Sequence, residues 1–281
     1  MRSLSTRFDP AADLTLGNSQ KPLFLLCNDD GVHAPGIRVL AEAIAPLGEV
    51  VVVAPHVERS ASSHAISIHS PLRVEQLSKN FYAVEGTPAD CIMLACRRLL
   101  HRKPTWVVSG INRGGNLGID TLYSGTVHAA MEGALHGYRS MAVSSHGRGV
   151  LNYETAGRVV RMLLERQDLL AVGDRFTINV NVPNLPFDEL KGIAVAGLGR
   201  RIYEDEMVEG IDPRGRPYYW IGAGGEMFED IPDSDCYLVD QGYATVSVLR
   251  PSLLDERAND QLRAKLPDAF SEAFQKAFAR K

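Results

Sequence analysis

Short apolar runs alternate with segments of helical period along the first two thirds of the chain. The runs show little apolar–polar alternation and several are rich in β-branched residues, which is typical of parallel strands covered on both faces. Strands that alternate with helices predict an α/β fold built on a parallel sheet through about residue 185. The predicted strands cover 23–27, 49–55, 105–110, 141–145 and 176–183, and the predicted helices cover 37–44, 88–99, 124–137 and 154–164.

Two further segments have β character outside this alternation. Residues 72–77 and 81–86 alternate apolar and polar side chains and predict a hairpin or an edge ribbon. Residues from about 195 to 235 are charged, aromatic and glycine-rich, with little helical period. They predict a projecting β-hairpin or loop, which we expect to act as an oligomerisation arm.

The two ends of the chain differ from its middle. Residues 1–20 lack a continuous apolar stretch, and we expect a flexible polar extension there rather than a secretory signal. Residues 251–281 predict a helical tail with an apolar stripe formed by Phe270, Phe274 and Phe278. The stripe packs either on the core of its own chain or on a neighbouring subunit.

Composition narrows the class of protein. A chain of 281 residues, 45% apolar and 23% charged, can bury a large core, and we expect a single domain over 21–250. The net charge of −4 and the pI of about 6.1 argue against a general affinity for nucleic acids. Four cysteines without a C-x-x-C pair predict reduced thiols and a cytoplasmic protein. No apolar run is long enough to cross a bilayer, so we expect no membrane partner.

Polar side chains gather after three of the predicted strands. Ligands of an open parallel sheet bind beyond the carboxyl ends of its strands, so these side chains are candidates for one site. The clusters are Asn28 with Asp29 and Asp30, then Ser60 with Ser62, Ser63 and His64, and finally the segment SGINRGGNLGIDTLYSGT over 109–126.

The adjacent acids Asp29 and Asp30 suggest a cation. Two neighbouring carboxylates repel each other more strongly as water is removed, and a divalent ion between them neutralises the pair. Oxygen donors favour Mg²⁺, Mn²⁺ or Ca²⁺ over Zn²⁺. The alternative is that the two acids form a solvated turn or cap the next helix.

The segment Ser124, Gly125 and Thr126 stands at the start of a predicted helix. Free backbone N–H groups and the positive end of the helix dipole make such a position suitable for an anion such as phosphate. The alternative is that these residues only cap their own helix. The preceding glycines allow close approach of a ligand, and Asn112 and Asn116 offer amide groups, although a structural loop would use the same residues.

Several common site types are excluded by their missing motifs. No G-x-G-x-x-G follows the first strand, and the G-x-G at 197–199 has Ile202 where a third glycine would stand. The G-x-x-x-x-G-K-[ST] loop, the G-x-S-x-G elbow and the H-E-x-x-H pair are also absent. His33, His64 and His128 lie near the clusters, but the sequence assigns none of them as a general base.

Five blocks of the chain resemble, in order and spacing, the SurE family of metal-dependent nucleotidases. The resemblance runs from about Leu23 to Leu249 and implies a Rossmann-like, mostly parallel sheet flanked by helices, with a projecting β-hairpin used in oligomers. The blocks are LLCNDDGVHAPGI, VVVAPHVERSASSHAISIHSPL, VVSGINRGGNLGIDTLYSGTVHAAMEG, INVNVPNLP and DPRGRPYYWIG.

The resemblance also implies roles for individual residues. One divalent metal ion per subunit, Mg²⁺ or Mn²⁺, would be held by Asp29, Asp30, Ser60 and Asn112. The catalytic set implied beside it consists of Asp29 and Asp30 with the phosphate-binding residues Asn116, Ser124, Gly125 and Thr126.

The implied activity is that of a 5′/3′-nucleotidase, a phosphoric monoester hydrolase. It would release phosphate from nucleoside monophosphates, with a metal-activated water as the nucleophile, and some members of the family also trim short polyphosphate. A covalent aspartyl-phosphate route is the rival chemistry, but the D-x-D spacing typical of it is missing. A nucleotide-binding or sensing protein without turnover is the rival function. The family forms homodimers or homotetramers, and the sequence favours neither.

Overall fold

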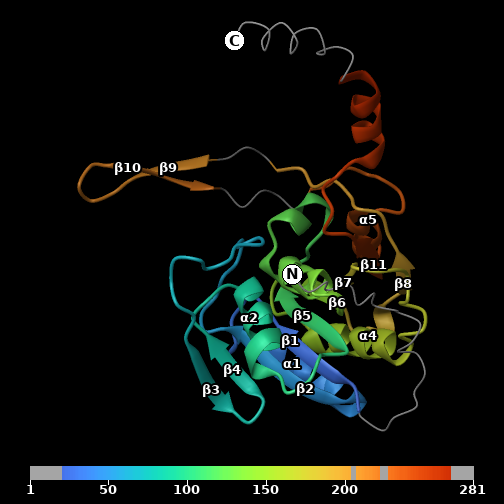
Figure 1. Cartoon of the computed structure of the whole chain (residues 1–281). Helices are drawn as coiled ribbons and strands as arrows, with labels where there is room; N and C mark the ends of the chain where they lie inside the picture. Colours follow the sequence, from blue (N-terminus) through green and yellow to red (C-terminus); the bar gives the residue numbers. More distant parts are fainter. Residues whose placement is uncertain (1–20, 204–206, 222–226, 267–281) are drawn as a thin grey trace, which may run out of the picture. The chain divides into compact units, whose positions relative to one another are not determined.

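The computed structural model describes residues 21–203, 207–221 and 227–266 (Figure 1). The chain divides into two compact units, with the boundary between Arg250 and Pro251. The predicted extension and the predicted phenylalanine stripe lie outside the described residues. Within the second unit the structure shows a helix over 256–266.

A large, mostly parallel sheet forms the centre of the first unit. Its strand order is β3-β4-β2-β1-β5-β6-β7-β11-β8, with antiparallel pairing only between β3 and β4 and between β7 and β11. The predicted α/β fold with a mostly parallel sheet is confirmed. The strands are β1 (Leu23–Cys27), β2 (Glu49–Pro55), β3 (Val74–Ser78), β4 (Phe81–Val84), β5 (Trp106–Arg113), β6 (Arg139–His146), β7 (Thr177–Pro183), β8 (Gly192–Val195) and β11 (Tyr243–Leu249).

Helices α2, α3 and α4 begin where a side chain caps their first N–H groups, whereas α1 begins at Pro35 without a side-chain cap. Thr87 caps α2 through a reciprocal capping box with Asp90, while Ser124 and Asn152 cap α3 and α4. Each of these caps satisfies an N–H that has no partner inside its own helix. The helices are α1 (Pro35–Ile44), α2 (Pro88–Leu94), α3 (Gly125–Leu135), α4 (Tyr153–Glu165) and α5 (Asp235–Asp240).

Helices cover both faces of the sheet. The Trp106 indole on β5 donates a hydrogen bond of 3.4 Å to Gln167, just beyond α4, whereas the next residue, Val107, lies against Gly133 of α3. Successive residues of a strand point to opposite faces, so α4 and α3 lie on opposite faces. Helix α1 packs against α4, and α2 packs against α3.

The β6–α4–β7 connection differs in hand from the other crossovers. Helix α3 connects β5 to β6. Helix α4 connects β6 to β7, the next strand in the same direction across the sheet, but it lies over the opposite face. Helix α1 leads from β1 to β2 in the reverse direction over the α4 face, so it shares the hand of α3. Because about 98% of such crossovers are right-handed, we assign α4 to the left-handed exception.

The parallel strands predicted through about residue 185 are present, and the sheet continues beyond them through two strands that the sequence pattern did not indicate. Strands β8 and β11 extend it to Leu249, with the hairpin of β9 (Met207–Ile211) and β10 (Pro217–Ile221) between them in the chain. Strand β8 has four residues, none of them buried, so it lacks the apolar run that marks a covered strand. The hairpin itself agrees with the predicted β character of this region.

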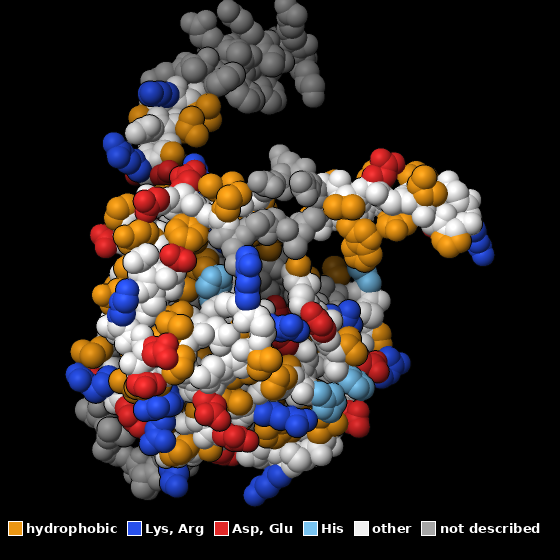
Figure 2. Space-filling view, turned by 180° about the vertical axis from the view of Figure 1, so that it is seen from behind, with side chains coloured by type: hydrophobic (Ala, Val, Ile, Leu, Met, Phe, Trp, Pro, Cys, Tyr) orange, Lys and Arg blue, Asp and Glu red, His pale blue; other side chains and the backbone are white. Residues whose placement is uncertain are grey.

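The surface of the protein mixes charges of both signs. Figure 2 shows acidic and basic side chains interspersed over the face seen from behind. No helix among the described residues is long and apolar enough to cross a membrane.

Because α1 packs closely on β5, a single methyl group added at Gly36 should lower the stability of the protein. A Cβ added to Gly36 would lie 2.0 Å from the Ile111 carbonyl oxygen, so Gly36→Ala must displace helix from strand. We expect it to lower the free energy of unfolding by about 1–3 kcal/mol, measured by urea denaturation. Gly197→Ala is the matched control, because a Cβ there meets nothing within 4 Å. Equal stabilities of the two variants would contradict the close packing of α1 on β5.

Candidate functional site

Asp29 follows β1 and lies against the first turn of α3. It is 4% exposed, and its carboxylate accepts a hydrogen bond from the Thr126 hydroxyl. Its backbone carbonyl accepts a bond of 2.7 Å from the Arg59 N–H, which ties the end of β1 to the loop after β2. Burial raises the pKa of Asp29 above its usual range, and the hydrogen bonds from Thr126 only partly oppose this.

Asp30 reaches β5 instead. Its carboxylate accepts a bond of 3.0 Å from the backbone N–H of Arg113, the residue directly after Asn112. Burial raises the pKa of Asp30 to about 6, and the negative charges of Asp29 and Glu58 add to the rise. The two neighbouring acids thus contact different elements, and the surroundings of each disfavour its ionised form.

The other two predicted ligands, Ser60 and Asn112, are on the segments that the acids contact. Ser60 directly follows Arg59, and its hydroxyl donates to Glu58 at 2.7 Å. Asn112 lies in β5, and its amide nitrogen donates to the Gly114 carbonyl at 2.8 Å. This bond uses the nitrogen, so the amide oxygen of Asn112 is the atom available to a ligand.

The chemistry of these donors fits a hard divalent cation. Two carboxylates, a hydroxyl and an amide carbonyl supply oxygens of the kind that Mg²⁺ and Mn²⁺ prefer. A cation would also neutralise the two buried acids whose pKa values are raised. Within the described part of the chain, no three His, Cys, Asp or Glu side chains are arranged to hold a metal. The predicted set has two such residues, so it depends on Ser60 and Asn112 for its remaining donors.

The first turn of α3 is the predicted anion site. Ser124 caps the helix by accepting a bond of 3.0 Å from the Val127 N–H. Thr126 contacts Asp29 through its hydroxyl, and a Cβ on Gly125 would come within 3.0 Å of an Asp29 carboxylate oxygen. A carboxylate of the protein therefore already lies at the positive end of this helix. The binding of phosphate by Ser124, Gly125 and Thr126 stays a prediction.

Asn116 belongs to a buried network rather than to the contacts around the acids. Its amide nitrogen donates to the Ser144 hydroxyl at 2.7 Å, and its backbone N–H donates to the Asn181 side chain at 2.8 Å. Its carbonyl accepts bonds from the side-chain amides of Asn179 and Asn181. These bonds fix the loop after β5 on β6 and β7, and a direct role of Asn116 toward phosphate stays a prediction.

The loop that carries Ser60 is held in an unusual backbone conformation. Ala61 and Ser63 have φ angles of 56° and 49°, in the left-handed region that residues other than glycine rarely adopt. Ser63 donates from its hydroxyl to the Leu122 carbonyl at 2.7 Å and from its N–H to the Tyr123 carbonyl at 3.0 Å. Contacts with the segment before α3 therefore hold the loop in place.

A buried acid on α3 anchors the same loop. His64 lies 2.9 Å from one carboxylate oxygen of Glu132, and His136 lies 3.0 Å from the other. The bond to His64 is the main cause that lowers the pKa of Glu132. The His64 ring lies 5.0 Å from that of His128, whose pKa is lowered by burial. Sequence reasoning missed Glu132 because 68 residues separate it from His64.

Two further acids, Asp235 and Glu58, lie near the candidate site and were not predicted from the sequence. Asp235 accepts bonds from the backbone N–H groups of Gly118 and Gly199 at 2.9 and 2.7 Å, and it thereby fixes the loop before α3. It stands 117 residues from Gly118 in the chain. Glu58 adds negative charge beside the paired acids, and only its short distance in sequence from Ser60 could have indicated it.

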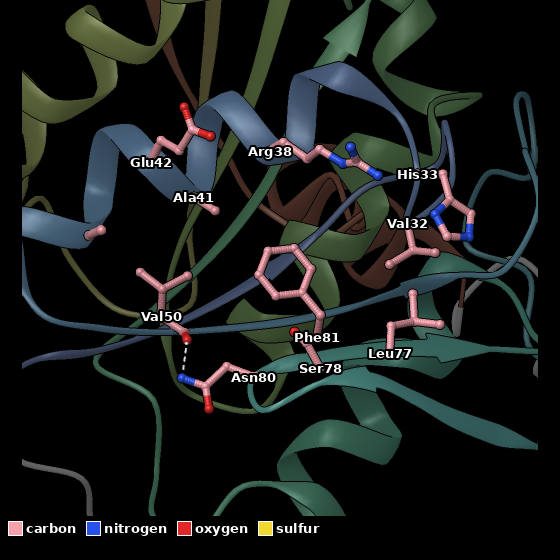
Figure 3. Close-up of a pocket in the computed structure, with 11 residues that line it drawn as sticks. Val32, His33, Arg38, Ala41, Glu42, Val50, Leu77, Ser78, Asn80 and Phe81 are labelled. Atoms are coloured by element: carbon pink, nitrogen blue, oxygen red, sulfur yellow. Dashed lines mark hydrogen bonds between the residues drawn. The ribbon is translucent and has the colours of Figure 1, made fainter.

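A groove of about 600 Å³ lies between α1 and the β3–β4 turn (Figure 3). The Phe81 ring points into it, and Asn80 donates to the Val50 carbonyl at 2.9 Å on its floor. Val32 and His33 connect the groove to the loop after β1. Its walls are mostly apolar and include none of the predicted ligands, so it is distinct from the candidate site.

Comparison with known proteins gives a consistent family match. The family model described as "Survival protein SurE" matches residues 24–205. A "5'-nucleotidase SurE" of Geobacter metallireducens is 48% identical over 235 residues, which cover 82% of this chain and 91% of that protein. A "5'-nucleotidase SurE" of Coxiella burnetii is 44% identical over 238 residues, covering 85% and 92% of the two chains.

A solved structure shows the same architecture. The crystal structure of a SurE protein from Aquifex aeolicus superposes with a TM-score of 0.78 at 40% sequence identity. The match covers 86% of this chain and 99% of that one.

The raised pKa of Asp30 predicts that this acid destabilises the metal-free fold at neutral pH. A carboxyl group whose pKa rises from 3.8 to about 6 on folding gives stability that is present below pH 4 and is lost as the pH rises through 6. In the presence of a chelator, Asp30→Asn should therefore raise the free energy of unfolding at pH 8 by about 1 kcal/mol, allowing for solvent screening. Below pH 4 the gain should vanish.

Urea unfolding at pH 8 and at pH 4 would measure this difference. Asp230→Asn is the control, because Asp230 is exposed and its replacement should give no pH-dependent gain. A wild-type protein more stable than the Asp30→Asn variant at pH 8 would show that the acid is well solvated or paired in the fold.

Proposed function

Because this chain belongs to the SurE family, we propose that its site carries out the reaction for which its relatives are named. The protein is a nucleotidase, a phosphomonoesterase that releases phosphate from nucleoside monophosphates. Metal dependence is consistent with the family. We place the reaction at the rim formed by β1, the loop after β2, the end of β5 and the first turn of α3.

One observation carries the placement. Asp29 and Asp30, adjacent in the chain, contact Thr126 at the start of α3 and Arg113 at the end of β5. The backbone of Asp29 also holds the loop that carries Ser60. Four segments far apart in sequence thus meet at the carboxyl edge of the sheet, where α/β proteins bind their ligands.

We assign Asp29, Asp30, Ser60 and Asn112 as the residues that would hold one Mg²⁺ or Mn²⁺ ion per subunit. When bound, the ion supplies Lewis acidity toward a phosphoryl oxygen and toward the attacking water. The structure supports this assignment through the oxygen chemistry of the four donors and the raised pKa values of the two acids. We favour attack by water over a covalent aspartyl intermediate.

The protein's own groups position the substrate in this proposal. The Thr126 hydroxyl orients the Asp29 carboxylate, and the Ser124 cap sets the first turn of α3. The positive end of the α3 dipole stabilises negative charge that develops on the phosphoryl oxygens. Gly125 lets Asp29 approach the helix closely, because any side chain there would collide with it.

The proposed partners are small molecules and a second copy of the chain. We propose nucleoside 5′- and 3′-monophosphates as substrates and short polyphosphate as a further one. The β9–β10 hairpin exposes Tyr219, Trp220 and Ile221, which supports its assignment as an oligomerisation arm of a homodimer or homotetramer.

Loss of one acid tests the metal assignment. Loss of a residue that only supports a metal ligand lowers activity by up to roughly 100-fold. Asp29→Asn changes a proposed ligand itself, so it should lower kcat for AMP by more than this. Phosphate release and circular dichroism together check that activity falls while the fold persists. Asp168→Asn, which removes an exposed acid paired with Arg166, should keep wild-type activity. A fully active Asp29→Asn enzyme would remove this residue from the site.

Metal removal tests the activity itself. Dialysis against EDTA should abolish phosphate release from AMP, 3′-AMP and a chromogenic phosphate ester, and added Mg²⁺ or Mn²⁺ should restore it, because the two buried acids need a counter-charge. Activity that survives complete chelation would exclude the proposed mechanism. If none of the esters is hydrolysed with any metal, nucleotide binding without turnover becomes the function.

A further inference from the structure

The hydroxyl of Ser62 is a buried polar group that the protein leaves without a partner. Its oxygen is shielded from solvent and forms no hydrogen bond with any described residue. The hydroxyls on either side of it in the loop are used differently: Ser60 donates to Glu58, and Ser63 donates to the Leu122 carbonyl. A buried hydroxyl is normally hydrogen-bonded, so an unpaired one beside a candidate site points to a ligand as its partner.

Ser62 lies directly over the first turn of α3. A Cβ built on Gly125 would come within 2.6 Å of the Ser62 hydroxyl oxygen and within 3.0 Å of an Asp29 carboxylate oxygen. The Ser62 hydroxyl and the Asp29 carboxylate therefore both lie close to the Gly125 backbone. No side chain fits at Gly125 without displacing one of these groups.

The start of α3 has a donor beside this hydroxyl that the helix itself does not use. Ser124 accepts the Val127 N–H, its own N–H donates to the Asp120 carbonyl, and Thr126 contacts Asp29. Gly125 is the first residue of α3, so its N–H has no acceptor within the helix itself. Two donors, one hydroxyl and one N–H, thus remain next to Asp29 at the positive end of the helix.

We propose that Ser62 is a substrate-contacting residue whose hydroxyl donates to a non-bridging oxygen of the phosphoryl group, beside the Gly125 N–H. The inference rests on the proposed function and adds to it a residue that the predicted catalytic set does not contain. The tetrahedral phosphoryl group presents several anionic oxygens, and an uncharged hydroxyl donor stabilises one of them without repelling the metal that the neighbouring acids would hold.

Replacement of Ser62 by alanine tests this contact in the full chain. Ser62→Ala should lower kcat/KM for AMP roughly 100-fold, as the loss of one preorganised donor does in other enzymes. The inhibition constant for inorganic phosphate should rise about tenfold, because a hydrogen bond to a charged group is lost. The Mn²⁺ concentration for half-maximal activity should stay unchanged.

Stability provides a second measurement. An unpaired hydroxyl holds nothing in the free protein, so Ser62→Ala should not lower the melting temperature. Ser140→Ala is the matched control: it removes a buried hydroxyl that donates to the Tyr138 carbonyl at the start of β6, at the other end of the sheet, so it should lower the melting temperature while leaving phosphate inhibition at the wild-type level. If Ser62→Ala folds poorly, the nearly isosteric Ser62→Cys, with a weaker donor, should give an intermediate loss of phosphate affinity.

Three outcomes would overturn the inference. Wild-type kinetics and phosphate inhibition of Ser62→Ala would show that the hydroxyl touches no substrate. A shift in the Mn²⁺ requirement without a change in phosphate inhibition would make Ser62 a metal ligand instead. If the wild-type protein hydrolyses no ester, the proposed function fails, but the Ser62 contact can still be tested by calorimetric titration with inorganic phosphate. Equal phosphate affinity of the wild type and Ser62→Ala would then overturn the contact.

Discussion

The fold largely buries two neighbouring carboxylates, and the contacts that define the candidate site are made by these two groups. Asp29 is shielded at the end of β1, and Asp30 is held against β5. The hydrogen bonds that they accept come from Thr126 and Arg113, and these bonds do not offset the cost of burial. A protein keeps such an arrangement when a cation or a reaction requires it, so the electrostatic penalty links stability to function.

The repetitive part of the fold could be predicted because burial leaves a pattern in the sequence. Apolar runs identified the central strands, and Ser124, a residue type that caps helices, marked the start of α3. Strand β8 was not predicted because it is short and unburied, so it has no apolar run to mark it in the sequence. The hand of the α4 crossover also escaped, since periodicity shows that a helix has an apolar face but not which face of the sheet it covers.

The candidate site was predictable in its location but not in its supporting contacts. The adjacency of Asp29 and Asp30 at a strand end identified the location, because parallel strands bring their carboxyl ends to one edge. Glu132 and Asp235 carry no local motif, since each acts on residues remote in the chain. The amide nitrogen of Asn116, a predicted phosphate-binding residue, donates to the buried Ser144 hydroxyl. Local chemistry cannot show such a choice.

The asparagines of β7 make assembly of the site depend on correct strand pairing. Asn179 and Asn181 point to the same face of the strand, and both bind the backbone of Asn116 in the loop after β5. A slip of β7 by one residue would turn both amides to the opposite face and leave the buried N–H and carbonyl of Asn116 unsatisfied. A chain with a shifted β7 would therefore lose the position of the loop after β5, which borders the candidate site, along with part of its stability.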